Sequence, residues 1–369
     1  MTAPWYLVDD VEAIPSPALL VYPDRVRENI TRMIAVAGGT ARLRPHVKTH
    51  KLPQVVQMQL EAGITKFKAA TIAEAEMTAA AGAADVLLAY PVVGPNIARL
   101  IDLVRRFPRT TFSALADDAS AVRALSAAAA EAGVTLNLWL DVDAGMHRSG
   151  IEPGAAATEI YRLFSTLPGL RPAGLHVYDG HVHQPELAVR TVACEASFAP
   201  VDRFRHGLIA AGLAVPSVVA GGTPTFPIHA RRLGVDCSPG TSLFWDWGYT
   251  QKLPDMDFLA AALLLTRVVS KPGGHRVCLD LGHKAVAAEN PQPRVYLFGL
   301  DDATAIGHSE EHLVIETSHA ERLRVGEAIY GMPYHICPTV ALHNEAVVID
   351  AGRVRERWPI VARARRITA

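Results

Sequence analysis

One segment of the chain places a lysine in surroundings that suit covalent chemistry. RPHVKTHK, residues 44–51, sets Lys48 among His46, His50 and Lys51 at the end of a β-rich run. Neighbouring cations and burial both lower the pKa of a lysine, which is what an amine needs to form a Schiff base. A solvated basic turn is the structural alternative for the same residues.

A second segment, PYHICPTVALH at 333–343, offers two metal ligands. In a strand, residues two positions apart point to the same face, so His335 and Cys337 could bind one ion together. Imidazole with thiolate favours zinc among the common metals. Two protein ligands are fewer than the usual three, so substrate and water would complete the shell. The alternative is a buried cysteine beside a hydrogen-bonded histidine.

Two glycine-rich turns could hold a phosphate, because glycine lets backbone N–H groups approach closely and threonine adds donors. They are AGGTPT at 220–225 and SPGTS at 238–242. The candidate residues in them are Gly221, Gly222, Thr223, Ser238, Gly240 and Thr241.

Two further motifs end in loops with polar side chains. DVDAGMHRSG at 141–150 contains Arg148, and GLHVYDGHVH at 174–183 contains Tyr178. His181 and His183 follow Tyr178, and either could act as a general base. A surface position is the alternative for each histidine.

The elements that must position these motifs alternate along the chain. From about residue 17 to 240, short β-rich runs alternate with alanine-rich stretches of helical period, which predicts βαβ units around a parallel sheet. The expected strands are 17–22, 43–48, 66–71, 85–90, 111–116, 136–143, 174–179, 217–222 and 233–240. Eight or nine repeats favour a closed (β/α)8 barrel, in which the C-terminal ends of the strands form the active site. No GxGxxG follows the first strand, which weakens a dinucleotide-binding alternative.

After about residue 255 helical periodicity fades, and β-branched runs separated by Gly, Pro and Asp take over. We therefore expect two domains: a barrel at 17–255 and a β-rich, metal-binding domain at 256–369. Residues 1–16 are expected to precede the first barrel strand and could pair with it.

Bulk composition excludes several classes of partner. The 369 residues carry a formal net charge of −1 with both signs interspersed, so no basic stripe predicts nucleic-acid binding. The longest apolar runs are too short to span a bilayer, and the N-terminus lacks the layout of a secretory signal. Four scattered cysteines without CxxC spacing indicate a reducing cytoplasm rather than a disulfide framework.

RPHVKTHK resembles the cofactor-lysine segment of the D-threonine aldolase and D-serine dehydratase family, whose barrel is similar to that of alanine racemase. The resemblance extends through the other motifs in order. It implies that Lys48 carries pyridoxal 5′-phosphate, that Arg148 reaches the phenolic oxygen, and that Tyr178 lies against the pyridine ring. It also assigns the two glycine-rich turns to the phosphate.

The resemblance further implies a divalent metal on His335 and Cys337, with zinc favoured and manganese or magnesium as alternatives. Alanine racemase has an arginine facing the pyridine nitrogen where this chain has Ser238, which disfavours the racemase reaction.

The implied function is a lyase acting on small D-3-hydroxy amino acids. We favour a dehydratase that yields a keto acid and ammonia, because the family's D-serine dehydratase-like members carry cysteine in the metal motif and its aldolases carry aspartate. Retro-aldol cleavage to glycine and an aldehyde is the alternative, for which His181 or His183 would serve as base. A non-catalytic cofactor-homeostasis protein is disfavoured because such proteins lack the second domain. By analogy we expect a homodimer.

Overall fold

The computed structural model describes residues 4–369, which form two compact units. The first, here called the β-rich unit, contains the chain up to Ile30, Thr49–Leu52 and Thr241–Arg363. The second, here called the barrel unit, contains Thr31–Lys48, Pro53–Gly240 and Ala364–Ala369. The predicted domain limits, 17–255 and 256–369, stay a prediction.

The barrel unit is built on seven parallel strands that pair in chain order. They are β2 (Lys66–Ala69), β3 (Asp85–Pro91), β4 (Thr111–Ala116), β5 (Leu136–Val142), β6 (Leu170–Val177), β7 (Ser217–Ala220) and β8 (Val235–Cys237). Residues 43–46 complete the ring through two parallel bridges, Leu43 to Cys237 on β8 and His46 to Lys68 on β2. Eight strand positions therefore close the barrel, and the predicted fold class is confirmed.

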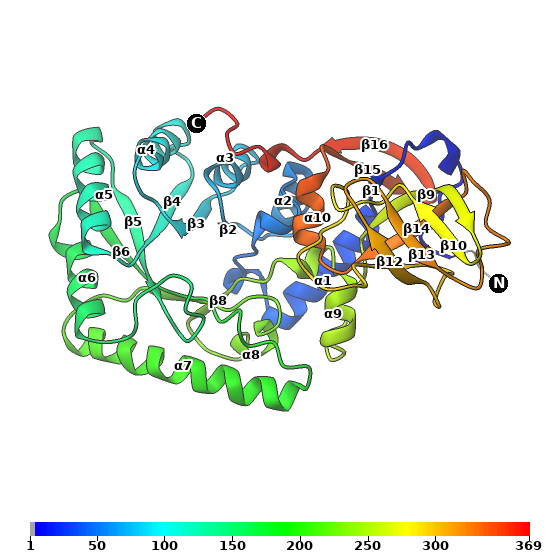
Figure 1. Ribbon diagram of the computed structural model, residues 1–369. Helices are drawn as coiled ribbons and strands as arrows, with labels where there is room; N and C mark the ends of the chain where they lie inside the picture. Colours follow the sequence, from blue (N-terminus) through cyan, green and yellow to red (C-terminus); the bar gives the residue numbers. More distant parts are fainter. Residues whose placement is uncertain (1–3) are drawn as a thin grey trace. The chain divides into compact units, whose positions relative to one another are not determined.

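Helices connect the strands and lie on the outside of the sheet (Figure 1). They are α2 (Pro53–Glu61), α3 (Ile72–Ala80), α4 (Asn96–Arg106), α5 (Ala119–Ala132), α6 (Ala155–Thr166), α7 (Leu187–Ala210) and α8 (Phe226–His229). Their ends follow local chemistry. The Asp118 side chain accepts the N–H groups of Ser120 and Ala121 at the start of α5, and Gly133 ends that helix in the left-handed conformation at φ +66°.

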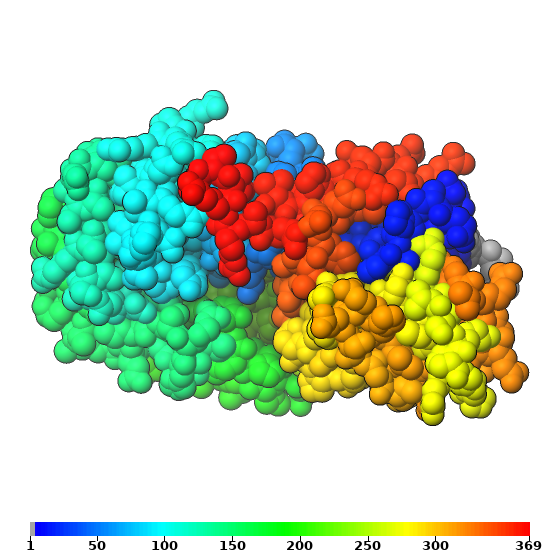
Figure 2. All heavy atoms as spheres, turned by 45° about the horizontal axis from the view of Figure 1, so that its top comes forward, coloured from blue at the N-terminus to red at the C-terminus, as the bar shows by residue number. Residues whose placement is uncertain are grey.

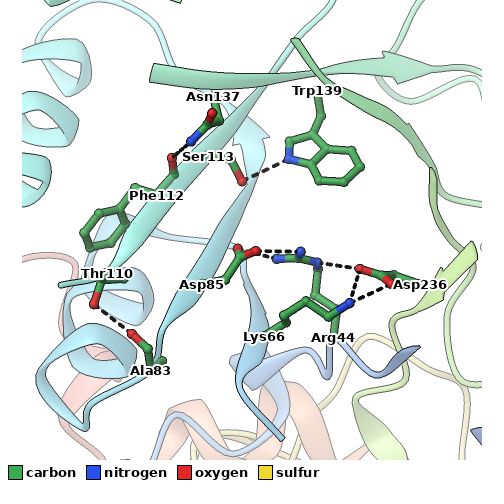
Figure 3. A network of polar contacts seen from close by, with 10 residues as sticks. All are labelled: Arg44, Lys66, Ala83, Asp85, Thr110, Phe112, Ser113, Asn137, Trp139 and Asp236. Carbon is green, nitrogen blue, oxygen red and sulfur yellow. Dashed lines mark hydrogen bonds and ion pairs between the residues drawn. The ribbon is translucent and has the colours of Figure 1, made fainter. Parts of the chain in front are cut away.

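The end of the barrel at which the strands begin is filled by a charged network (Figure 3). The buried Arg44 guanidinium donates to both carboxylate oxygens of Asp85, at 2.6 and 3.0 Å. Lys66 donates to both oxygens of Asp236 at 2.8 Å, and Arg44 lies 3.5 Å from Asp236. Two cations and two anions balance there. This leaves the opposite end, where the strands finish, for a ligand.

The β-rich unit is a nine-stranded sheet. Its strands are β1 (Ala18–Val21), β9 (Ala262–Gly273), β10 (Arg276–Leu279), β11 (Val295–Leu297), β12 (Thr304–His308), β13 (Leu313–Glu316), β14 (Ala328–Pro333), β15 (Glu345–Asp350) and β16 (Arg353–Pro359). Its helices are α9 (Trp247–Lys252) and α10 (Ile336–Leu342), and α1 (Pro23–Ala37) runs from this unit into the barrel unit. Short 3-10 helices occur at Val11–Ala13, Thr40–Arg42, Val47–Thr49, Thr241–Leu243 and Val361–Arg363.

Two strand assignments were wrong. The expected strand 43–48 forms only two isolated bridges and then the 3-10 helix Val47–Thr49. We expected 17–22 to be the first barrel strand, but β1 pairs antiparallel with β9 and parallel with β15. All four of its residues are buried, and a short apolar run of this kind fits any fully covered strand. Residues 4–16 form no strand beside β1. Instead, the Arg267 side chain donates to the carbonyls of Ile14 and Val11.

The C-terminal segment lies on the barrel unit, over α3 and α4. The Glu76 carboxylate accepts the N–H groups of Thr368 and Ala369, and Arg99 donates to the Ala369 carbonyl. Figure 2 shows this red segment resting on the cyan surface around α4. No helix among the described residues combines the length and apolar character that a membrane crossing requires.

Candidate active site

Lys48 stands at the C-terminal end of the first barrel position. It lies in the short 3-10 helix Val47–Thr49, directly after the bridged residues 43–46, and its side chain is half-buried. The backbone N–H of Lys48 donates to Nδ1 of His46 at 3.3 Å. This end of a barrel is where catalytic side chains collect.

Arg148 and Tyr178 come together at the same end. Arg148 lies in the loop after β5, and Tyr178 directly follows β6. The Arg148 guanidinium carbon is 4.7 Å from the centre of the Tyr178 ring, a cation–π distance. The planar guanidinium of Arg148 therefore lies over the aromatic face of Tyr178.

A second lysine, which the sequence analysis missed, reaches the same ring. Nζ of Lys68 is 5.8 Å from the centre of the Tyr178 ring, and the residue is only 3% exposed. Burial and the charge of Lys48 lower the pKa of Lys68 to about 7. The sequence holds a signal for it, since Lys66 and Lys68 alternate with apolar residues on β2 and so share one face.

A buried carboxylate–imidazole pair, also missed, lies on the neighbouring strands β5 and β6. Nδ1 of His176 is 2.7 Å from Oδ1 of Asp141, and the Ser149 hydroxyl donates to Oδ2 at 2.9 Å. Burial alone would raise the pKa of Asp141, but the bonds from His176 and Ser149 lower it. Burial also lowers the pKa of His176, despite Asp141. The pair is thus an ionised carboxylate beside a neutral imidazole.

The two glycine-rich turns meet each other. The Gly240 N–H donates to the Thr223 hydroxyl at 3.1 Å. Gly221 has φ +75°, and a Cβ there would lie 2.6 Å from the His229 ring. A Cβ at Gly222 would lie 3.1 Å from the Tyr178 ring. Both glycines are therefore needed where the backbone passes close to side chains of the site.

Ser238 supplies a test of whether this region fits a ligand. Its hydroxyl is buried and has no hydrogen-bond partner among residues 4–369. A buried polar atom without a partner costs about 1–3 kcal/mol, so a ligand atom is expected there. Together with the close-approach glycines, this fits a ligand with polar atoms, which a phosphorylated cofactor would supply. Thr241 follows Gly240 and begins the 3-10 helix Thr241–Leu243 of the β-rich unit.

Only one group of three potential metal ligands occurs within residues 4–369: Asp179, Cys194 and His229, all buried. Nε2 of His229 is 2.8 Å from Oδ2 of Asp179. Tetrahedral coordination would hold two such atoms about 3.3 Å apart, given metal distances of roughly 2.0 Å. The Cys194 sulfur lies 3.4 Å from Nε2 of His229 and 3.8 Å from Oδ2 of Asp179, within hydrogen-bond distance of both. The trio is therefore a hydrogen-bonded cluster. Its Asp179 also accepts the Thr225 hydroxyl at 2.8 Å and so ties the Tyr178 loop to the first glycine-rich turn.

The two candidate histidines differ in surroundings. Nε2 of His181 is 3.1 Å from the Ser197 hydroxyl on α7, and a Cβ at Gly145 would lie 3.2 Å from the same nitrogen. Nδ1 of His181 is buried without a partner among the described residues. His183 is exposed. Of the two, His181 lies against the loop that carries Arg148.

His335 and Cys337 meet, but not as strand neighbours. The strand expectation was wrong: β14 ends at Pro333, His335 precedes α10, and Cys337 is the second residue of that helix. Nδ1 of His335 is 2.5 Å from Glu289, which leaves Nε2 for another partner. Burial would lower the pKa of His335, but a hydrogen bond with Cys337 and its charge raise it to about 9.

Three side chains of the β-rich unit surround this pair. The Thr49 hydroxyl is 3.2 Å from the Cys337 sulfur, and the Thr241 hydroxyl is 3.5 Å from it. The buried Asp246 carboxylate accepts the N–H of Ile336, the residue between the pair, at 3.1 Å. Sequence reasoning missed Thr49 and Asp246, because they are remote in the chain.

Comparison with known proteins assigns both parts of the chain. Residues 21–246 match the family model described as alanine racemase, N-terminal domain. Residues 261–349 match the model described as putative serine dehydratase domain.

Relatives match over nearly the whole length. A 3-hydroxy-D-aspartate aldolase of Paracoccus denitrificans is 30% identical over 96% of this chain and 94% of its own. A D-threo-3-hydroxyaspartate dehydratase of Delftia sp. is 28% identical over 95% of this chain and 98% of its own. The structure of a D-threo-3-hydroxyaspartate dehydratase, solved as a cysteine-to-alanine variant in a metal-free form, has a TM-score of 0.81 at 26% identity over 95% of this chain and 98% of its own.

The crystal structure of D-threonine aldolase from Filomicrobium marinum superimposes with a TM-score of 0.89 at 28% identity, covering 98% of this chain and 99% of that one. With both family models matched in order and both kinds of lyase among its full-length relatives, the chain belongs to the D-threonine aldolase and D-serine dehydratase-like family of pyridoxal phosphate-dependent lyases.

Proposed function

We propose that this protein is a pyridoxal phosphate- and divalent metal-dependent lyase that removes water from D-3-hydroxy amino acids. The observation that carries the dehydratase assignment is the placement of His335 at the N-cap and Cys337 in the first turn of α10, with cysteine rather than aspartate two positions after the histidine. We expect zinc in preference to manganese or magnesium, a homodimer, and a cytoplasmic location.

The residues at the strand ends fit the cofactor. Lys48 would hold its aldehyde carbon, Arg148 would contact its phenolic oxygen, and Tyr178 would lie against its ring. Gly221, Gly222, Thr223, Gly240 and Thr241 would surround its phosphate, and the unpartnered Ser238 hydroxyl would bind its pyridine nitrogen. When bound, the cofactor delocalises the electron pair left on Cα as a bond to Cα breaks.

The metal would be held by Nε2 of His335 and Sγ of Cys337. Glu289 would orient the imidazole through Nδ1, as carboxylates do for metal-bound histidines. The thiolate would accept from the Thr49 and Thr241 hydroxyls. When bound, the metal withdraws electrons from the substrate hydroxyl and so assists its departure.

In this reaction Nζ of Lys48 would take the α-proton, the Cβ–O bond would break, and that same proton would leave with the hydroxyl as water. The 2-aminoacrylate released from D-serine then reacts with water to give pyruvate and ammonia. No protein base is needed at the hydroxyl, because the metal assists its departure.

A second candidate is retro-aldol cleavage to glycine and an aldehyde. The observation that favours it is His181, which lies against the Arg148 loop with an unpartnered buried nitrogen. In that reaction an imidazole takes the proton of the substrate hydroxyl while Cα–Cβ breaks, and Lys48 returns a proton to Cα.

The product from D-threonine separates the two. Dehydration gives 2-oxobutyrate and ammonia, whereas cleavage gives glycine and acetaldehyde. His183 provides a matched control, because it is exposed and two residues from His181. If dehydration is the reaction, His181→Ala should lose less than the roughly 10²–10⁴-fold expected for removal of a general base. Glycine as the dominant product would reject our leading assignment.

Borohydride reduction tests the cofactor lysine. The purified protein should be yellow, and reduction followed by peptide mapping should place the label on Lys48. A label on Lys51 or Lys68 would overturn the assignment.

A further inference from the structure

Lys68 is a buried lysine that forms no salt bridge with the described residues. The residue is 3% exposed, and among residues 4–369 its ammonium group makes no hydrogen bond or salt bridge. A charge removed from water without a partner is costly, so such a group is kept only where a ligand supplies the partner or where it stays neutral.

The surroundings of Lys68 hold more positive than available negative charge. Lys48 and Arg148 are the nearby cations, and Asp141 and Asp179 are the nearby carboxylates. Both carboxylates are already engaged, Asp141 by His176 and Ser149, and Asp179 by His229 and Thr225. Three cations thus face two carboxylates that have other partners. A bound anion would restore the balance.

The position of Lys68 indicates which oxygen of a bound anion it would contact. Lys68 and Arg148 both lie over the Tyr178 ring, at 5.8 and 4.7 Å from its centre. Their side chains come from β2 and from the loop after β5, so they approach the ring from different strands. The proposed function places this ring against the cofactor and Arg148 at the phenolic oxygen.

We propose that Lys68 is a second cationic contact of pyridoxal phosphate and shares the phenolic oxygen with Arg148. This inference rests on the proposed function. Without the cofactor, burial and the charge of Lys48 lower the pKa of Lys68 to about 7. Binding of an anionic oxygen beside Lys68 favours its ammonium form near neutral pH. The groups that face Lys68 in this titration are Lys48, Arg148, Asp141, Asp179 and the buried imidazole of His176. A cation at this position would keep the phenolic oxygen ionised to lower pH.

The same chemistry could serve a substrate carboxylate, and the test distinguishes the two sources. Three variants are compared as purified holoenzymes. Lys68→Met removes the charge at similar length, Lys68→Arg keeps it, and Lys284→Met is the control, an exposed lysine paired with Glu310. The measurements are the dissociation constant for pyridoxal phosphate by equilibrium dialysis, the visible absorption as a function of pH without substrate, and KM for D-serine.

Lys68→Met should bind pyridoxal phosphate about 10- to 100-fold more weakly, the loss expected for a hydrogen bond to a charged group. Its visible absorption should change with pH at a higher midpoint than in the wild type. Lys68→Arg should restore most of both properties, and Lys284→Met should match the wild type. Without cofactor, Lys68→Met should unfold at the same or a higher temperature than wild type, because a buried charge has been replaced by an apolar chain.

An unchanged dissociation constant and spectrum in Lys68→Met would overturn the inference. A raised KM alone would also overturn it, by assigning Lys68 to the substrate carboxylate. Borohydride labelling keeps the two proposals apart. If Lys48 is labelled and Lys68→Met has an unchanged dissociation constant and spectrum, only this inference is rejected. If no lysine of the wild type is labelled, the proposed function is rejected.

Discussion

The Thr49 hydroxyl lies 3.2 Å from the sulfur of Cys337, although 288 positions separate them in the chain. Thr49 directly follows Lys48, yet Thr49–Leu52 belongs to the β-rich unit, whereas Lys48 belongs to the barrel unit. The chain therefore passes from the proposed cofactor lysine to a neighbour of the proposed metal cysteine within one peptide bond. Thr49 therefore follows the proposed cofactor lysine in the sequence and contacts the proposed metal ligand.

Replacing Thr49 by valine should weaken metal binding and leave cofactor content unchanged. The hydroxyl can donate to the Cys337 thiolate, and removal of such a supporting contact typically costs 10- to 100-fold in metal affinity. Metal titration with a chelating competitor measures the change. Thr158→Val is the matched control, because the Thr158 hydroxyl donates to the Gly154 carbonyl in an exposed turn of α6. Equal affinity in Thr49→Val and Thr158→Val would contradict the role of Thr49.

Removing the metal should abolish activity without releasing the cofactor. With His335 and Cys337 as the only protein ligands that we assign, binding should be moderate. A chelator should strip the ion, and added zinc or manganese should restore turnover. Cys337→Ala should no longer be rescued by metal, whereas Cys337→Asp should keep a metal-binding oxygen. Full turnover by metal-free Cys337→Ala would show that the pair does not serve catalysis.

Gly221→Ala should disrupt the first glycine-rich turn. Gly221 has φ +75°, and the new Cβ would lie 2.6 Å from the His229 ring and 2.7 Å from the Thr225 hydroxyl. Gly212→Ala is the control for the backbone alone, since Gly212 has φ +77° and nothing within 4 Å. The control should lose about 1 kcal/mol of folding free energy. Gly221→Ala should lose more than this and also bind pyridoxal phosphate more weakly, as urea unfolding and dialysis will measure. Identical behaviour of the two variants would show that the close contacts at Gly221 are harmless.

The sequence predicted the barrel well because alternating strand and helix patterns admit few other folds. It assigned β1 wrongly because four consecutive apolar residues fit any strand that is covered on both faces. It missed Lys68, Asp141 and His176 because polar residues alternating with apolar ones look like a solvent-facing strand. Inside a barrel that polar face points to the ligand instead.

The metal pair shows a different limit. The HxC spacing indicated the two ligands, and the expected strand was the wrong element to hold them. Pro338 gave a usable signal, since proline is tolerated in the first turn of a helix and disfavoured within a central strand. The pair is surrounded by residues from remote parts of the chain, Glu289, Thr49 and Asp246. No local sequence pattern predicts that these residues lie there.

The stability of the protein should fall in mild acid because of His50. This side chain is fully buried, its Nδ1 accepts the Leu52 N–H at 3.1 Å, and burial lowers its pKa to about 3. In the unfolded chain a histidine titrates near pH 6.5. Below that pH the His50 imidazole is therefore protonated in the unfolded chain but stays neutral in the folded protein. The stabilising contribution of neutral His50 is therefore complete above about pH 6.5 and declines as pH falls toward 3.

Between pH 7 and pH 5 this linkage amounts to about 2 kcal/mol. His50→Asn removes the titration and keeps an acceptor that can face Leu52, so its unfolding free energy should fall about 2 kcal/mol less than that of the wild type over this range. Urea unfolding at pH 7, 6 and 5 measures the difference. His206→Asn is the control, because His206 is exposed on α7 and should leave the wild-type pH dependence intact. Parallel pH profiles for wild type and His50→Asn would mean that the buried imidazole takes up its proton in the folded protein as readily as in the unfolded chain.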